Sequence, residues 1–193
     1  MLNLNVKGRP AHAGMQHEKG RSAIREMAHQ VLALESMTDY ERGITVSVGK
    51  IEGGTVRNTV SGFCRCQIDF RVPNMGAAAA EVLHRMRSLF PVDPDFELDI
   101  DLQLNRPPMV KTEEAQALLS VAQTYALQAG FVLEDAPMAG GGSDANFTST
   151  IGIPTLDGLG ADGKGAHTLH EHMLISTLGQ RLQFWSLLLQ RLL

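Results

Sequence analysis

The residues best suited to bind a ligand or a metal ion lie in the last third of the chain, in a glycine-rich turn and a histidine loop. The turn reads GGGSDA over residues 140–145, and the loop reads GAHT over residues 165–168, with Glu171 four positions after His167. Successive glycines let backbone N–H groups approach a ligand closely, because no Cβ intervenes and positive φ costs little. Histidine is a common metal ligand. The two segments therefore predict an anion cradle beside a metal ligand, with an unliganded loop histidine as the plain alternative.

Two cysteines form a second candidate site. Cys64 and Cys66 are separated by one residue in a strand-like pattern, so their side chains share one face of the strand. They are too close along one strand for an ordinary disulfide. A metal-binding pair is the alternative, but C-x-C without a second cluster is a weak signal. We therefore expect two buried thiols, and the redox compartment stays open.

Composition excludes several classes of partner. The chain has 193 residues and a formal net charge of −4, and it contains no run of basic residues. Nucleic acids and anionic membranes are bound by clustered Lys and Arg, so neither partner is expected. No apolar stretch approaches the roughly 20 residues of a membrane span, and no signal peptide is recognisable. We expect a cytoplasmic protein, although a periplasmic or secreted one fits the same residues.

The first 105 residues show strands and amphipathic helices in the order β-α-β-β-α-β. Apolar residues alternate with polar ones in four segments and recur at helical spacing in two others. The strands are expected near 2–6, 44–48, 64–72 and 96–104, and the helices near 20–37 and 78–90. Because every strand is apolar on one side only, these elements predict a four-stranded antiparallel sheet with both helices on its apolar face. This is the ferredoxin-like α+β arrangement.

Residues 106–193 show a different, α/β-type pattern. Thr112 is expected to cap a helix that ends at Gly130, followed by a short strand at 131–133 and a short helix from about Asp144. A closing helix from about residue 175 carries apolar residues at helical spacing, namely Leu178, Leu182, Trp185, Leu188 and Leu192. These pieces contain too few strands to close an α/β layer. We therefore expect a larger catalytic domain, interrupted by the module at 1–105, of which 106–193 is the C-terminal portion.

Six segments, taken together and in order, resemble one enzyme family. They are RPAHAG at 9–14, GTVRN at 54–58, DFR at 69–71, NRP at 105–107, GGGSDAN at 140–146, and GAHT at 165–168 with Glu171. The family is that of the dinuclear-zinc glutamate carboxypeptidases, acetylornithine deacetylases, succinyl-diaminopimelate desuccinylases and aminoacylases. The glycine turn is most similar to the glutamate carboxypeptidase branch. The resemblance covers essentially the whole chain and makes residues 1–105 the family's lid, or dimerisation, domain.

The resemblance implies roles for several histidines and one arginine. His167 matches the family's C-terminal metal ligand, which binds one of two zinc ions, whereas His170 and His172 do not match and are expected to be surface residues. His12 matches the lid histidine that reaches into the partner subunit's active site as a catalytic residue and helps to hold the oxyanion. Arg106 matches the arginine that grips the substrate carboxylate through two parallel hydrogen bonds, and its alternative is a surface or hinge arginine.

Further substrate contacts follow from the same resemblance. Asn58 and Arg71 correspond to lid residues that contact substrate, although Arg71 fits equally well as an exposed structural charge. Gly141 and Gly142 correspond to backbone donors beside the substrate carboxylate, which agrees with an anion cradle formed by successive glycines.

The chain also departs from the family. It contains no H-x-D motif, and the Glu113–Glu114 pair lies in the first turn of a predicted helix, where acidic residues are expected for the helix dipole alone. The resemblance thus implies a homodimeric, two-zinc hydrolase of an amide bond next to a free carboxylate, such as a C-terminal glutamate or an N-acyl amino acid. The chain alone is expected to be inactive. The alternative is a non-catalytic dimerisation or binding module that retains the fold.

Overall fold

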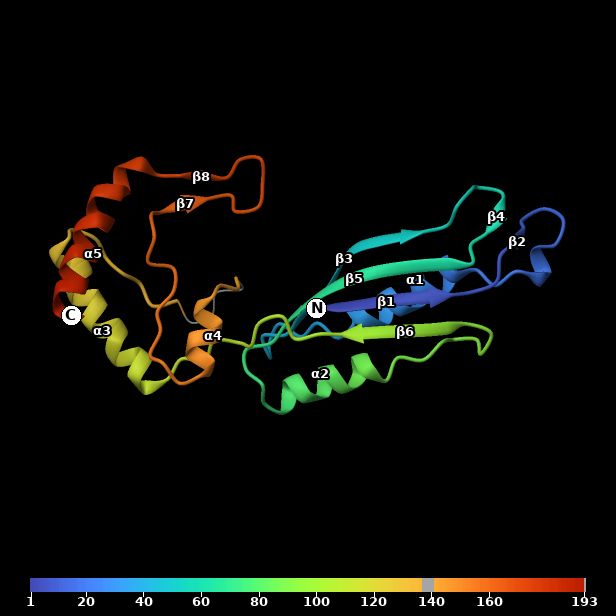
Figure 1. Ribbon diagram of the computed structural model, residues 1–193, viewed down its shortest axis with the longest axis horizontal. Helices are drawn as coiled ribbons and strands as arrows, with labels where there is room; N and C mark the ends of the chain where they lie inside the picture. The colour runs from blue at the N-terminus through green and yellow to red at the C-terminus, as the bar shows by residue number, and fades with distance from the viewer. Residues whose placement is uncertain (137–140, 193) are drawn as a thin grey trace. The chain divides into compact units, whose positions relative to one another are not determined.

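The chain folds into two compact units, Met1–Pro108 and Met109–Leu193 (Figure 1). The structure is a computed structural model that describes residues 1–136 and 141–192. None of the described helices is long and apolar enough to cross a membrane.

The first unit is built on a four-stranded antiparallel sheet. Its strands are β1 (Leu2–Lys7), β3 (Thr45–Gly53), β5 (Phe63–Arg71) and β6 (Glu97–Leu102), in the spatial order β3-β5-β1-β6. The helices α1 (Ala23–Glu35) and α2 (Ala77–Arg87) cover one face (Figure 1). Element order and strand pairing confirm the α+β module with an antiparallel four-stranded sheet that the sequence predicts.

One face of this sheet is apolar and buried, and the other is polar and open, as expected for strands in which apolar and polar residues alternate. Leu2, Leu4 and Val6 of the central strand β1 are fully buried against the helices. The intervening residues carry cross-strand pairs on the open face, where the Asn3 and Asn5 amides each donate a hydrogen bond of 3.2 Å to an aspartate of β6. Apolar burial therefore sets the register, because a one-residue slip would turn the whole apolar set outward.

Cys64 and Cys66 are free thiols in the apolar core, as predicted. Burial raises the pKa of both thiols, and it raises that of Cys66 to about 11. An unfolded chain loses this proton at lower pH than the folded chain, so the raised pKa stabilises the fold below pH 9 and this stabilisation is lost as the pH rises toward 11.

We expect the native chain to resist thiol-specific disulfide reagents at pH 8, since thiolate is the reactive form and both sulfur atoms are buried. Both thiols should react after unfolding in denaturant, which a colorimetric thiol count measures. The free energy of unfolding should fall between pH 8 and pH 10.5, and this fall should be smaller in Cys66→Ala. Rapid labelling of the native chain would contradict the burial argument.

The buried face of α1 follows the apolar spacing of the sequence only in part. Met27 and Leu34 are buried, as this spacing indicates, but Ile24 and Ala28 are exposed. Glu26 and Gln30 are buried in addition. Glu26 Oε1 accepts hydrogen bonds from Gln30 Nε2 at 2.8 Å and from the Val92 N–H at 3.1 Å. The helix is thus rotated toward a loop whose backbone satisfies its two buried polar side chains.

The second unit is a small helical layer with a two-stranded hairpin. Its helices are α3 (Glu113–Gln128), α4 (Ala145–Thr150) and α5 (Leu178–Leu192), preceded by the 3₁₀ turn η2 (Ile175–Thr177), and its hairpin pairs β7 (Gly163–Lys164) with β8 (His172–Met173). Thr112 caps α3 by accepting a hydrogen bond from the Ala115 N–H, and Gly130 follows α3 with φ of 87°, as predicted.

One prediction for this unit is wrong, and another holds only in part. Residues 131–133 form no strand, and Phe131 instead packs edge-on against Phe184 of α5 with ring centroids 5.5 Å apart. On α5, Leu188 is buried as its apolar spacing indicates, but the other buried side chain is Phe184, whereas Leu182 is 75% exposed; the Leu192 side chain lies outside the described part. Helical spacing alone did not indicate which side of α5 meets α3.

Candidate functional site

The pairing of two very short strands gathers predicted site residues in the first unit. β2 (Ala11–His12) lies antiparallel to β4 (Thr59–Val60), which places His12 opposite Thr59. The Ala13 N–H donates a hydrogen bond of 2.9 Å to the carbonyl of Asn58. The structure therefore brings His12 and Asn58 together, although they come from separate loops of the chain.

The His12 ring is oriented by its own loop. Its side chain is exposed, and Nδ1 accepts a hydrogen bond of 3.1 Å from the Gly14 N–H. A neutral imidazole that accepts at Nδ1 carries its proton on Nε2. The free ring edge of His12 therefore presents an N–H donor, which is the group needed to stabilise a developing oxyanion.

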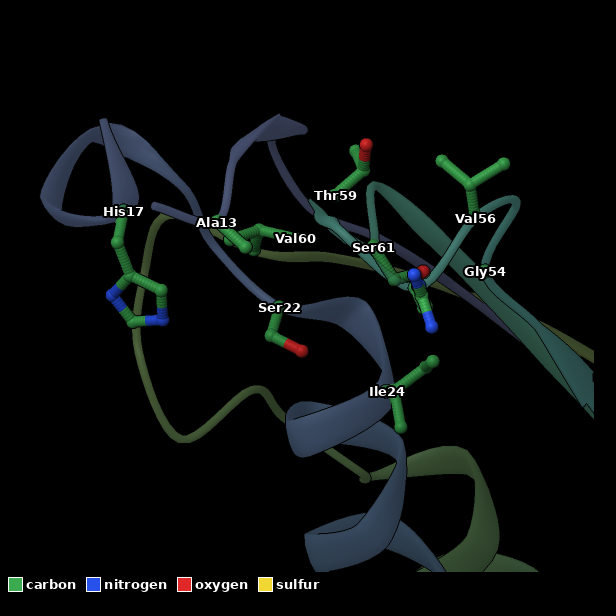
Figure 2. Close-up of a pocket in the computed structure, with 10 residues that line it drawn as sticks. Ala13, His17, Ser22, Ile24, Gly54, Val56, Thr59, Val60 and Ser61 are labelled. Carbon is green, nitrogen blue, oxygen red and sulfur yellow. The ribbon is translucent and has the colours of Figure 1, made fainter. Parts of the chain in front are cut away.

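A cleft lies beside this pair of short strands (Figure 2). It is open to solvent, encloses about 340 Å³, and lies between the 3₁₀ turn η1 (His17–Lys19), the start of α1 and the β3–β4 connection. Its lining combines apolar Ile24 and Val56 with polar Ser22 and basic Arg57. Sequence reasoning did not identify this cleft. The available signal was the GTVRN segment at 54–58, which contains Arg57 and two further lining residues, Gly54 and Val56.

Arg71 and Arg106 lie at the other end of the sheet. β5 starts at Phe63, beside β4, and ends at Arg71, which is about 26 Å of extended strand. The Arg71 Nε donates a hydrogen bond of 2.8 Å to Asp69 Oδ2. Arg106 is exposed and follows the end of β6, which pairs with Leu2 at that same end. Within this unit, the structure therefore separates both arginines from His12.

The glycine turn belongs to the second unit and is described from Gly141 onward, so Gly140 lies outside the described residues. Gly141 and Gly142 are exposed, and a Cβ added to Gly141 would meet no atom of the described residues within 4 Å. Among the described residues, nothing therefore covers the Gly141 backbone.

Polar side chains hold the turn after these glycines. The Ser143 N–H donates a hydrogen bond of 2.8 Å to Oδ1 of the buried Asn146. The Ser143 hydroxyl donates one of 2.8 Å to Asp157 Oδ2. Sequence reasoning did not identify this contact, because it joins two turns that are separated by α4.

His167 lies in the loop that joins β7 to β8. Gly165 has φ of 76°, and His167 itself has φ of 64°, a conformation that no other non-glycine residue adopts among residues 1–136 and 141–192. The His167 N–H donates a hydrogen bond of 3.0 Å to Glu171 Oε2. The side chains of His167, His170 and His172 are all exposed, as was predicted for the latter two.

A side chain of α5 anchors the base of this hairpin. Arg181 Nη2 lies 2.6 Å from Oδ1 of Asp162, the residue before β7, and the guanidinium stacks 4.0 Å from the centre of the Phe131 ring. The Arg181 side chain is only 12% exposed. Sequence reasoning did not identify Arg181, because a single arginine on a predicted amphipathic helix is usually a solvent-facing charge.

The metal-binding side chains among the described residues do not by themselves fit a zinc centre. Structural and catalytic zinc ions take at least three protein ligands from Cys, His, Asp and Glu. In the described part of the chain, no group of three or more such side chains is placed to hold a metal ion. His167 is thus a single candidate ligand, and any metal centre that it serves needs donors from outside the described residues.

Comparison with known proteins finds similar chains among peptidases. Residues 1–93 match the M20 family described as "Peptidase dimerisation domain". The chain is 26% identical over 183 residues to carboxypeptidase G2 of Pseudomonas sp. (strain RS-16), covering 94% of this chain and 44% of that protein.

Two further relatives show a similar extent of coverage. The chain is 28% identical over 175 residues to the uncharacterized protein YqjE of Bacillus subtilis, covering 90% of this chain and 46% of that protein. It also superposes on the crystal structure of aminopeptidase PepT from Bacillus cereus with a TM-score of 0.70 at 24% identity, covering 97% of this chain and 50% of the other. The chain therefore spans about half the length of the relatives it matches.

Proposed function

Residues 1–93 belong to the M20 peptidase dimerisation domains, and from this premise we propose that the chain is part of a dimeric zinc-dependent peptidase or amidohydrolase. The proposed reaction is hydrolysis of an amide bond next to a free carboxylate, such as that of a C-terminal glutamate or an N-acyl amino acid. The similarity to carboxypeptidase G2 over 94% of the chain supports this class of reaction. The observation that carries it is the β2–β4 pairing, which sets the His12 donor beside Asn58.

We assign different tasks to the two units. Residues 1–105 would form the lid and dimerisation domain, and residues 106–193 the C-terminal segment of an α/β catalytic domain. The second unit leaves Leu182, Ile175 and Ile151 more than 70% exposed, which is costly for a layer that folds alone. These surfaces support packing against a further segment of a longer protein.

The site residues take separate roles in this proposal. His12 donates a hydrogen bond to the developing oxyanion, and Arg106 grips the substrate carboxylate. The backbone at Gly141 and Gly142 adds donors for the same carboxylate, while Asn58 and Arg71 contact substrate. His167 is one ligand of a two-zinc centre whose other ligands come from outside this chain.

The dimer is proposed to form along α1 and β3. In the described part of the chain, β3 pairs with β5 alone. Side chains bond the first half of its other edge, where the Thr38 hydroxyl pairs with the Val46 backbone and Glu35 accepts from the Val48 N–H, so the stretch from Lys50 to Gly53 is the part left for a partner strand. Beside β3, α1 exposes Ile24 (45%) and Leu32 (72%), and β3 itself exposes Ile51 (53%). A helix stripe next to an open strand edge suits a two-fold interface, because both features can pair with themselves.

We expect Leu32→Asp to weaken dimerisation by about 100-fold, since it replaces an apolar side chain that the proposed interface would bury with a charge that must lose water there. Analytical ultracentrifugation over a range of concentrations measures the change in Kd. Met15→Asp is the matched control, because Met15 is 80% exposed and lies off the stripe. Equal dissociation constants for both variants would rule out α1 as the interface.

The activity is tested on the longer protein that contains this chain. Purified protein loaded with zinc is assayed against a panel of N-acyl amino acids and dipeptides, each with its amidated counterpart. We expect hydrolysis of substrates with a free C-terminal carboxylate and little turnover of the amides, because Arg106 and the glycine turn would lose their charged partner. Dimerisation without hydrolysis of any substrate would instead favour the non-catalytic binding module.

A further inference from the structure

The backbone of His167 is held in a conformation that L-amino acids seldom adopt. Its φ of 64° lies in the left-handed region, where the side chain crowds the following carbonyl. A non-glycine residue keeps this strained conformation only where contacts with its surroundings offset the cost. Something near His167 must therefore favour this conformation over the extended one.

The loop's own hydrogen bonds account for the turn before His167. The Thr168 N–H and hydroxyl donate to the Gly165 carbonyl at 3.0 and 2.7 Å, and the pairing of β7 with β8 closes the loop. These bonds fix residues on either side of His167 and leave its own N–H without a backbone partner among them.

Glu171 supplies the partner for that N–H. Its Oε2 lies 3.0 Å from the His167 nitrogen, and the Glu171 N–H in turn donates to the Thr168 carbonyl at 3.2 Å. A carboxylate makes this a charge-assisted hydrogen bond, which is stronger than one between neutral groups. The Glu171 side chain reaches back across the loop to His167, four residues earlier.

We propose that Glu171 is a positioning residue that holds the His167 backbone in the left-handed conformation and so sets the direction of the imidazole. The role of this arrangement in metal binding rests on the proposed function, in which His167 is a metal ligand. A ligand whose backbone is set before the metal arrives loses less conformational freedom on binding. The hydrogen bond itself belongs to this chain and is testable without any metal or substrate.

The test is NMR spectroscopy of the 193-residue chain and its Glu171 variants. A residue with positive φ has its amide hydrogen unusually close to its own Hα, which produces a strong intraresidue HN–Hα NOE. We expect this strong NOE at His167 in the wild type, its loss in Glu171→Ala, and its retention in Glu171→Gln, whose amide oxygen still accepts. Glu134→Ala, which removes another exposed carboxylate of the same unit, should leave the NOE unchanged.

A second measurement separates local positioning from unfolding. NOEs between Gly163 and Met173 report the β7–β8 pairing, and they should survive in Glu171→Ala. A strong His167 NOE that persists in Glu171→Ala would overturn the proposal. So would its loss in both variants together with the hairpin NOEs, because Glu171 would then support the fold of the loop rather than His167. Neither result bears on hydrolysis by the longer protein, so the two proposals fail separately.

Discussion

Mixing two inactive variants of the longer protein, His12→Ala and His167→Ala, is expected to restore activity. If His12 serves the partner subunit's site, the mixed dimer holds one site with both residues intact. Random exchange at equal concentrations makes half of the dimers mixed, so about a quarter of the sites become active. Alone, His12→Ala should lower kcat by about 100- to 1,000-fold, the usual effect of removing one oxyanion donor.

The position of His12 within the first unit supports this arrangement. The chain leaves the sheet toward the second unit after Leu102, which pairs with Leu2 at the start of β1. His12 follows Lys7, the last residue of that same strand. The donor thus lies at the end of the sheet remote from the connector to its own second unit.

The experiment uses subunit exchange in mild denaturant, followed by rate measurements on a carboxylate-bearing substrate. His84→Ala, an exposed histidine on α2, is the control that should keep wild-type activity. Mixing either inactive variant with itself gives the baseline. A mixture no more active than that baseline would show that His12 does not act across the dimer.

Phe184→Ala is expected to destabilise the second unit strongly while leaving the stability of the first unit unchanged. Phe184 is fully buried and contacts Phe131 and Trp185, in a core with few other large side chains. Replacing a buried Phe by Ala costs about 3–5 kcal/mol. A unit of this size has about 4–13 kcal/mol of stability in total, so the loss removes a large share of it.

The chain's single tryptophan, Trp185, reports this change because it lies beside Phe184. Denaturation in urea, followed by Trp fluorescence, should show a much lower midpoint for Phe184→Ala. Amide exchange of β1 should stay slow, because its core of Leu2, Leu4 and Val6 lies in the first unit. Leu182→Ala removes an exposed side chain from the same helix and should change stability by less than about 0.5 kcal/mol. Equal midpoints for the two variants would contradict the assignment of this core.

The strands of the first unit were predictable because their signal is local. Period-2 alternation in β1 and β5 depends only on which side chains face the helices, and a half-buried strand shows it directly. The pairing of β2 with β4 was not predictable, because strands of two residues have no period to detect. The same holds for residues 131–133, whose apolar character reflects packing of Phe131 on α5 rather than a strand.

The sequence by itself determined the α+β module, the caps of α3, the buried thiols and the set of candidate catalytic, substrate-binding and metal-binding residues. Only the tertiary structure decided that His12 lies beside Asn58, that Arg71 lies at the far end of the sheet, and that Glu171 holds the backbone of His167. The reason is physical: periodicity and capping are properties of neighbouring residues, whereas these contacts depend on where loops meet after the apolar faces have been buried.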